Sequence, residues 1–429
     1  MTTETPISAP APETAQKGAS KGALAFIIAT VVLDMLSIGL IVPIMPRLVE
    51  GFFPGQTTDA AHALGFAMSC WALLQFIMSP ILGALSDQFG RRPIILVSCV
   101  GLGVSYFATA LAPTFALFLA ARLISGATAG NISAANAYIA DVTPPSGRAK
   151  AFGMLGAAFG VGFTFGPGLG GLLGAIDIRF PLYAAGALCF INAAYGYFIL
   201  PESHKVENRT PFQWRKANPI GALAVFKDQP MLYALLPVYG LFSLAQSVFP
   251  STFVLYAEHR YHFDTVVTGA TMGASSTLMI LAQVFLVQRV VRGLGERRAM
   301  MVALCFGATG FALYGLAPTP LWFWASMPVM TLWAVFTPSI QSLMTQRVSP
   351  SAQGRLQGGL ASITALMGIF APQLYTTLFA LGVSKTLPGG VDLPGAPFLT
   401  ASFCLIIALT IAYFAVRRSP TSGRPGASA

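Results

Sequence analysis

The chain has 429 residues, of which 55% are apolar and only 9% are charged. A soluble globular domain has about 25% charged residues, so a chain with a mean hydropathy of +0.69 is not expected to fold in water. The net charge of +10 is compatible with a nucleic-acid partner, but the placement of the basic residues described below argues against one. The five cysteines form no CxxC pair, so neither a disulfide framework nor a metal site is expected.

Twelve stretches are long and apolar enough to be membrane spans, since a helix needs about 20 apolar residues to cross a bilayer. The predicted spans are 23–46, 64–85, 94–112, 114–140, 152–176, 180–200, 231–257, 264–290, 299–317, 321–345, 356–382 and 396–416. Residues 1–22 are rich in Thr, Ala and Pro and are predicted to be a disordered tail. The sequence thus predicts an all-α integral membrane protein.

The longest polar gap, 201–230, divides six spans from six. We therefore expect an N-terminal half over 23–200, a central loop over 201–230, a C-terminal half over 231–416 and a tail over 417–429. If the N-terminus is cytoplasmic, 20 of the 25 Lys and Arg residues fall on the cytoplasmic side and four on the other. Because basic residues concentrate in cytoplasmic loops, both termini are predicted to be cytoplasmic.

The two halves resemble each other at two landmarks. Gly90 with two following arginines comes after the second span, and Gly295 with a similar pair comes after the eighth, 205 residues later. Arg148 and Arg355 follow the fourth and tenth spans at a separation of 207 residues. The nearly constant separation indicates a duplication, and therefore two pseudo-symmetric six-helix halves.

Asp34 is the one acid in the middle of a predicted span, roughly 18 Å from either end. A charged aspartate there costs about 2.5–3.5 kcal/mol on insertion scales. It must therefore face a cavity, pair with a cation or carry a proton. The functional interpretation is a proton-coupling carboxylate, and the alternative is a structural carboxylate bonded to neighbouring helices.

Arg122 is the one cation well inside a span, roughly 12 Å from its outer end. Asp34 and Arg122 therefore lie at similar depth, and we expect them to be neighbours in the N-terminal half. A nearby guanidinium favours the ionised carboxylate until a substrate or a movement separates the two. The alternative is an ion pair that only orients helices.

The loop between the second and third spans reads Gly83-Ala84-Leu85-Ser86-Asp87-Gln88-Phe89-Gly90-Arg91-Arg92. The glycines permit close packing and a tight reversal, and opposite charges can form charge-assisted bonds that lock one conformation. Asp141, at the cytoplasmic end of the fourth span, is a plausible third charged member. The predicted gate comprises Gly83, Asp87, Gly90, Arg91, Arg92 and Asp141.

The fifth span is rich in glycine around Pro167. Small residues at three- and four-residue spacing let a neighbouring helix approach closely, and proline adds a bend. The candidates for a specialised bend that controls leak are Gly162, Gly166, Pro167, Gly170 and Gly171; the alternative is generic packing. Candidate cavity-lining amides are Gln75, Asn136, Gln246, Gln283 and Gln341, each of which could instead join helices.

Several of these runs carry a family resemblance. Residues 83–96 resemble motif A of the major facilitator superfamily, 160–171 resemble the antiporter motif of its proton-driven drug-efflux branch, and Arg122 occupies the motif B arginine position. More specifically, the runs that resemble bacterial tetracycline/proton antiporters are 33–43, 137–141, 200–205, 295–299 and 356–358. The resemblance covers about 23–416. It implies the major facilitator fold, a transport role for Asp34 and a polar lining of Gln246, Gln283 and Gln341.

One departure bears on the cargo. Tetracycline pumps carry further aspartates in the third and ninth helices, where this chain has Ser105 and Gly307. Those acids are linked to the charged drug–metal chelate and the proton, so their loss argues against tetracycline itself.

The resemblance implies a monomeric, proton-coupled exporter in the bacterial inner membrane, without cofactor, metal or nucleic acid. It would export a small amphipathic compound, a tetracycline-like drug or a related one, by alternating access. The alternatives are a metabolite importer or uniporter of the same fold, and a receptor or membrane enzyme that does not transport. The absence of HExxH, P-loop and GxSxG motifs argues against an enzyme.

Overall fold

The computed structural model describes residues 13–144, 147–204, 206–212, 230–348, 353–384 and 392–417. These residues form helices and connecting turns, without a strand. Twelve segments among them are long and apolar enough to cross a membrane, which confirms the predicted number of spans. Nine are single helices, and three are built from two or three consecutive helices.

The first half contains six candidate spans and one short helix. Its elements are α1 Glu13–Ile41, α2 Met45–Glu50, α3 Thr57–Phe89, α4 Arg91–Leu111, α5 Phe115–Thr128, α6 Asn131–Val142, α7 Arg148–Ile176 and α8 Phe180–Ile199. Helices α5 and α6 together make one span. Local chemistry sets several boundaries: Pro46 occupies the first turn of α2, and the Thr114 side chain caps α5 by accepting a bond from Leu117 N.

The second half repeats this plan. Its elements are α9 Pro230–Gln246, α10 Val248–Tyr261, α11 Thr265–Phe285, α12 Val287–Leu316, α13 Pro320–Thr331, η4 Leu332–Val335, α14 Phe336–Thr345, α15 Gln353–Val383 and α16 Ala396–Arg417. Helices α9 and α10 form one span, and α13, η4 and α14 form another. The short helix η2, Val206–Asn208, lies between the halves in sequence.

The observed boundaries correct one prediction, the disordered tail over 1–22. Helix α1 begins at Glu13, so residues 13–22 of the predicted tail are helical. Alanine, glutamate, glutamine and lysine in this stretch favour a helix once α1 nucleates it. Of the predicted loop 201–230, the structure describes 201–204, 206–212 and Pro230, and residues 1–12 lie outside the described chain.

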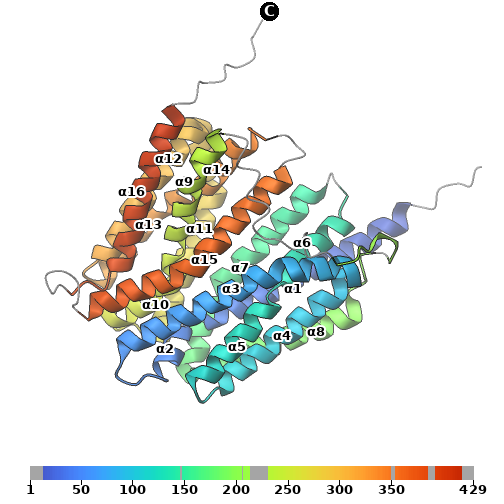
Figure 1. The fold of residues 1–429 in the computed structure, drawn as a ribbon, viewed down its shortest axis with the longest axis horizontal. Helices are drawn as coiled ribbons and strands as arrows, with labels where there is room; N and C mark the ends of the chain where they lie inside the picture. The colour runs from blue at the N-terminus through green and yellow to red at the C-terminus, as the bar shows by residue number, and fades with distance from the viewer. Residues whose placement is uncertain are drawn as a thin grey trace, which may run out of the picture.

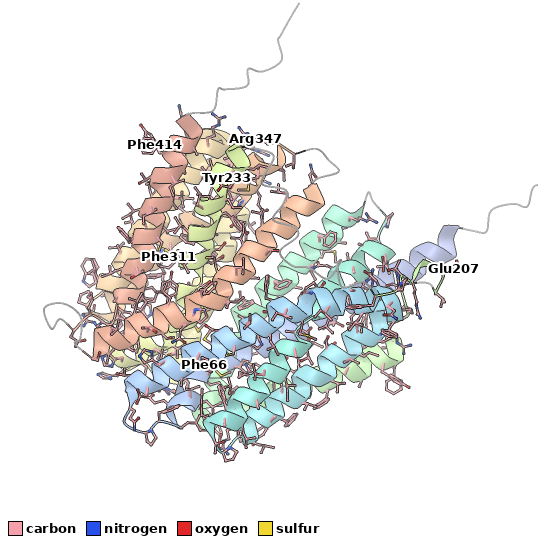
Figure 2. The ribbon with its side chains drawn as sticks, in the orientation of Figure 1. Phe66, Glu207, Tyr233, Phe311, Arg347 and Phe414 are labelled. Atoms are coloured by element: carbon pink, nitrogen blue, oxygen red, sulfur yellow. The ribbon has the colours of Figure 1, made fainter. Side chains whose placement is uncertain are left out.

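Large apolar side chains cover the outside of the bundle. Phe66 of α3, Tyr233 of α9 and Phe414 of α16 are 50%, 67% and 55% exposed, whereas Phe311 of α12 is buried among helices (Figure 2). Water cannot stabilise so much apolar surface, and lipid can. The exposed residues therefore mark the faces that contact the bilayer.

The halves meet mainly through two helix pairs, α3 with α15 and α7 with α11. Glycines allow both contacts. A β-carbon at Gly65 of α3 would overlap the Thr376 hydroxyl of α15, and one at Gly171 of α7 would overlap the Thr265 carbonyl of α11. The close approach of these backbones holds the two halves together.

The halves touch at one end and diverge towards the other. We call the end where α1 begins and α16 finishes the terminal end, and the opposite end the far end. Helices α3 and α15 lie together at the far end, near α2 and α10, and separate towards the terminal end (Figure 1). At the far end Arg47 pairs with Glu258, and the Thr377 hydroxyl lies 3.4 Å from His62 Nδ1. The shape is therefore closed at the far end.

Candidate functional site

Asp34 lies in α1 and is only 5% exposed. Its Oδ1 accepts a hydrogen bond of 3.3 Å from Asn192 Nδ2 of α8. The same amide donates to the Thr30 carbonyl at 3.3 Å and lies 3.6 Å from Cys99 Sγ of α4. A buried carboxylate in a membrane helix needs such donors, so the Asn192 amide of α8, which also contacts α4, helps to hold Asp34 in place.

The sequence analysis missed Asn192. This residue is 1% exposed and lies inside an otherwise apolar span. A polar amide in such a span is costly unless it bonds to a neighbouring helix. The same reasoning that selected the other amides could have selected Asn192, but sequence alone could not place it beside Asp34.

Arg122 of α5 is 8% exposed, and its guanidinium carbon lies 5.7 Å from the centroid of the Tyr106 ring of α4. Its Nε and one terminal nitrogen have no hydrogen-bond acceptor among the described residues. The aromatic face offers partial compensation for the buried charge. Arg122 is therefore a cation with donors still available to a group that enters the neighbouring cavity.

Asp34 and Arg122 line the same cavity, as their similar depth predicts. This charged cavity has a volume of about 280 Å³ and is bounded mainly by α1, α3, α4 and α5. Gln75 and Trp71 of α3 also line it, and the Trp71 indole donates to Ser125 Oγ at 3.3 Å. Among the described residues that line it, Asp34 and Arg122 are the two that carry a formal charge.

A second cavity adjoins the charged one. This aromatic cavity, about 480 Å³, lies between α7 of the first half and α9 to α13 of the second. Its walls include Phe249, Phe311, Tyr314 and Trp333, with Gln246 as one of few polar groups. Val42, Phe163 and Pro250 line both cavities, so the charged cavity and the aromatic one share part of their walls.

Two of the five predicted lining amides border these cavities, and three do not. Gln75 lines the charged cavity and Gln246 the aromatic cavity. Gln283 continues the face of α11 that carries Ser276 and Met279, but it lies nearer the terminal end, beyond the cavity, and is exposed. Asn136 of α6 and Gln341 of α14 are partly buried and line neither cavity.

The predicted gate residues lie together at the terminal end. Arg91 pairs with Asp87 at 2.5 Å and with Asp141 at 3.2 Å, and it donates to Ser86 Oγ at 2.7 Å. Gly90 has a φ of +110°, which favours glycine and permits the tight turn from α3 to α4. Gly83 faces Ser133 of α6, because a β-carbon there would lie 3.4 Å from its hydroxyl.

Glu202, which follows α8, is a member of this cluster that sequence reasoning did not assign to it. Its carboxylate accepts bonds from Arg91 N at 2.9 Å and Arg92 N at 3.2 Å, so it caps the N-terminus of α4. The Arg92 side chain instead donates to the Tyr197 carbonyl and lies over the Tyr197 ring. The segment after α8 thus contacts the predicted gate residues and holds them within the first half.

The second half carries a related turn. Gly295 has a φ of +72° and interrupts α12 where Gly90 interrupts the path from α3 to α4. Glu296 accepts bonds from Ser342 Oγ at 2.7 Å and Gln346 Nε2 at 3.0 Å, both near the end of the tenth span. The parallel arrangement agrees with the duplication that the sequence indicates.

The glycines of α7 face two different helices. A β-carbon at Gly166 would come within 2.6 Å of Gly39 Cα, and those at Gly162 and Gly170 would overlap Met35 and Leu40 of α1. Pro167 and Gly171 instead face Gly269 and Thr265 of α11. At these glycines the backbone of α7 therefore lies directly against α1 of its own half and α11 of the other half.

The two positions that lack acids are tightly packed. Ser105 is fully buried and donates to the Leu102 carbonyl at 2.8 Å. At Gly307 of α12 a β-carbon would overlap the Trp333 ring, with Cζ3 2.6 Å away. An aspartate side chain at Gly307 would need the volume that Trp333 fills.

The Major Facilitator Superfamily model matches residues 27–372 of this chain, which is most of its length. The chain belongs to the Major Facilitator Superfamily. It is 35% identical over 368 residues to the class C tetracycline resistance protein of Escherichia coli, covering 85% of this chain and 91% of that protein. It is 28% identical to multidrug resistance protein 2 of Bacillus subtilis, covering 89% and 92%. These similarities confirm the predicted resemblance.

Solved structures of the superfamily share the fold. The human organic anion transporter MFSD10 superposes with a TM-score of 0.67 at 25% identity, covering 92% of this chain and 99% of that one. A bacterial homologue of the lysosomal transporter Spinster, in an inward-facing conformation, superposes with a TM-score of 0.74 at 15% identity, covering 94% and 98%. The major facilitator fold of this membrane protein is therefore confirmed.

Proposed function

We propose that this protein is a proton-coupled exporter of small amphipathic, drug-like compounds that works by alternating access. The observation that carries the proposal is the buried Asp34 in a cavity with Arg122, next to a second cavity between the halves. Similarity to tetracycline and multidrug resistance proteins supports export of such compounds. The two chambers provide separate places for a proton and a cargo.

In this mechanism Asp34 exchanges its proton with the side to which the cavity is open. A proton on Asp34 removes its charge and weakens its attraction to Arg122 and to the Asn192 amide. Loss of that proton restores both interactions. Rocking of the two halves alternately exposes the cavities to each side, and α7, packed on both α1 and α11, is the contact along which the halves move.

The gate residues would lock the terminal end when that end is closed. Asp87, Arg91 and Asp141 lie where α3, α4 and α6 meet, and none of them lines either cavity. They therefore serve the conformational change and do not bind cargo. The pair Arg47 and Glu258 has the corresponding position at the far end.

We further propose that the protein works as a monomer in the bacterial inner membrane, with the terminal end in the cytoplasm. The bias of 20 basic residues against four supports this orientation. A protease site added after residue 429 tests it: cleavage in inside-out vesicles, and none in intact cells with a permeable outer membrane, is the expected result. The reverse pattern would contradict the orientation.

Reconstituted vesicles test the coupling. With purified protein and a fluorescent drug, an imposed pH gradient should drive the drug against its concentration gradient, and a protonophore should abolish that movement. A metabolite importer or uniporter of the same fold is the competing function. It would equilibrate its substrate without any response to the pH gradient.

A further inference from the structure

The aromatic cavity lacks the charge that a charged cargo requires. Among the described residues that line it, none is Asp, Glu, Lys, Arg or His. The adjoining charged cavity contributes one acid, Asp34, and one base, Arg122, which balance each other. A cation that entered the aromatic cavity would lose its water without meeting an acid among the described lining residues, which is unfavourable.

Aromatic ring faces attract cations, so this attraction must be compared with the free-energy cost of taking a cation out of water. Phe242 stacks on Trp333 with ring centroids 4.5 Å apart, and Phe311 meets it edge-on at 5.1 Å. Trp333 and Phe311 line the cavity but are only 4% and 2% exposed, so each contributes a small, tightly packed patch of its wall and not a whole open ring face. The attraction of these rings for a cation is smaller than the cost of desolvating the cation.

The contact between Gly307 and Trp333 fixes this apolar wall. Because Gly307 has no side chain, the Trp333 ring packs directly against the α12 backbone. An acid at position 307 would displace the ring and add a charge. Gly307 therefore places no acid at this position and lets Trp333 pack as part of a rigid aromatic surface. A rigid surface lowers the ordering cost of binding a flat ligand.

A few polar groups complete the cavity. Gln246 and Ser276 line it beside the exposed Phe163 and the thioether of Met279. Apolar walls with few hydrogen-bonding groups are typical of sites for small organic molecules, where the polar groups set orientation. The thioether adapts to ring edges of different shape.

We infer that the aromatic cavity binds an electrically neutral, flat, multi-ring compound, held between the Phe163 side and the Phe311–Trp333 wall with its polar edge towards Gln246. The interpretation of this cavity as the cargo site rests on the proposed function. It defines the class of cargo: a neutral molecule rather than an organic cation or a metal chelate.

A matched pair of tricyclic probes tests the charge requirement. Acridone is neutral, and 10-methylacridinium has a similar shape with a fixed positive charge. Fluorescence titration of the full-length protein in lipid nanodiscs should give at least tenfold tighter binding of acridone. Equal or tighter binding of 10-methylacridinium would overturn the inference.

Two substitutions test the location. Gly307→Ala adds a methyl group against Trp333 without charge and should weaken acridone binding at least tenfold. Gly368→Ala of α15 is the control, since a β-carbon there meets nothing within 4 Å, and it should bind acridone as the wild type does. Unchanged acridone binding in folded Gly307→Ala would overturn the location.

Met279→Glu provides a test that does not depend on the packing at Gly307. Met279 is partly buried in the cavity wall, so a glutamate there supplies the missing counter-ion. The variant should bind 10-methylacridinium at least tenfold more tightly than the wild type and acridone more weakly. No change in the preference would contradict the inference. Because binding is measured without transport, loss of pH-driven export would leave this result intact and would count only against the proposed function.

Discussion

Arg47 of α2 and Glu258 of α10 join the two halves at the far end, with Arg47 Nε 2.8 Å from Glu258 Oε1. A second bond, from Arg47 to the Phe263 carbonyl at 2.7 Å, strengthens the contact. The gate contacts at the opposite end remain within the first half and the segment that follows α8. The far end is therefore closed by an interaction that must break when the transporter opens there.

Breaking this pair should favour opening at the far end. Both side chains are about one-third exposed, so the pair is worth at most about 1 kcal/mol. Its loss changes the ratio of the two states by up to about fivefold. Spin labels on α2 and α10 in Glu258→Gln should therefore report a larger population at long distance. Arg179→Ala, which removes an exposed far-end cation, is the control; an equal change in both variants would exclude a specific latch.

Asn192→Ala should move the pH dependence of transport. The amide donates to the Asp34 carboxylate, so its loss favours the protonated carboxyl. A bond to a charged group is worth about 1.5–3 kcal/mol, so the half-maximal pH should rise by about one to two units. Export measured between pH 5 and 9 checks this shift.

Cys99→Ala is the comparison for Asn192→Ala, because the Cys99 thiol of α4 contacts the same amide at 3.6 Å and is a much weaker hydrogen-bond partner than the amide is for a carboxylate. Its pH profile should remain close to that of the wild type. If both variants lose activity without a change in profile, Asn192 has only a packing role.

The glycine contact between α7 and α1 should tolerate no methyl group. Gly166→Ala brings a β-carbon to 2.6 Å from Gly39 Cα, and overpacking of this kind costs about 1–3 kcal/mol. The thermal unfolding midpoint in detergent should fall. Gly168→Ala, on a face of α7 with nothing within 4 Å, should leave the midpoint unchanged, and equal stability of the two variants would disprove the contact.

Removal of the Glu202 carboxylate should loosen the gate. Glu202 caps α4 through two backbone N–H groups, and loss of such a cap costs about 0.5–2 kcal/mol. Glu202→Ala should therefore lower the unfolding midpoint and slow export. Glu207→Ala, an exposed acid of η2 in the same segment (Figure 2), should change neither, and matching effects would point to net charge instead.

Hydropathy was sufficient to predict the twelve spans, because the bilayer imposes a length and an apolar composition on each one. That Asp34 and Arg122 line the same cavity also followed from their depth along their helices. Depth does not determine which side of a helix faces a cavity, and this is why it could not show that Asn136, Gln283 and Gln341 lie outside the two described cavities. Asn192 and Glu202 act through contacts with distant residues, and those contacts depend on how the helices pack. The packing of the Trp333 ring into the space beside Gly307 likewise could be found only from the folded structure.

The central claim is that Asp34 carries the proton that drives export, and Asp34→Asn in reconstituted vesicles tests it most directly. The amide cannot exchange a proton, so pH-gradient-driven export should be lost while acridone binding remains. Asp59→Asn, at an exposed acid in the first turn of α3, should export as the wild type does. Export at the wild-type rate by folded Asp34→Asn would contradict the account.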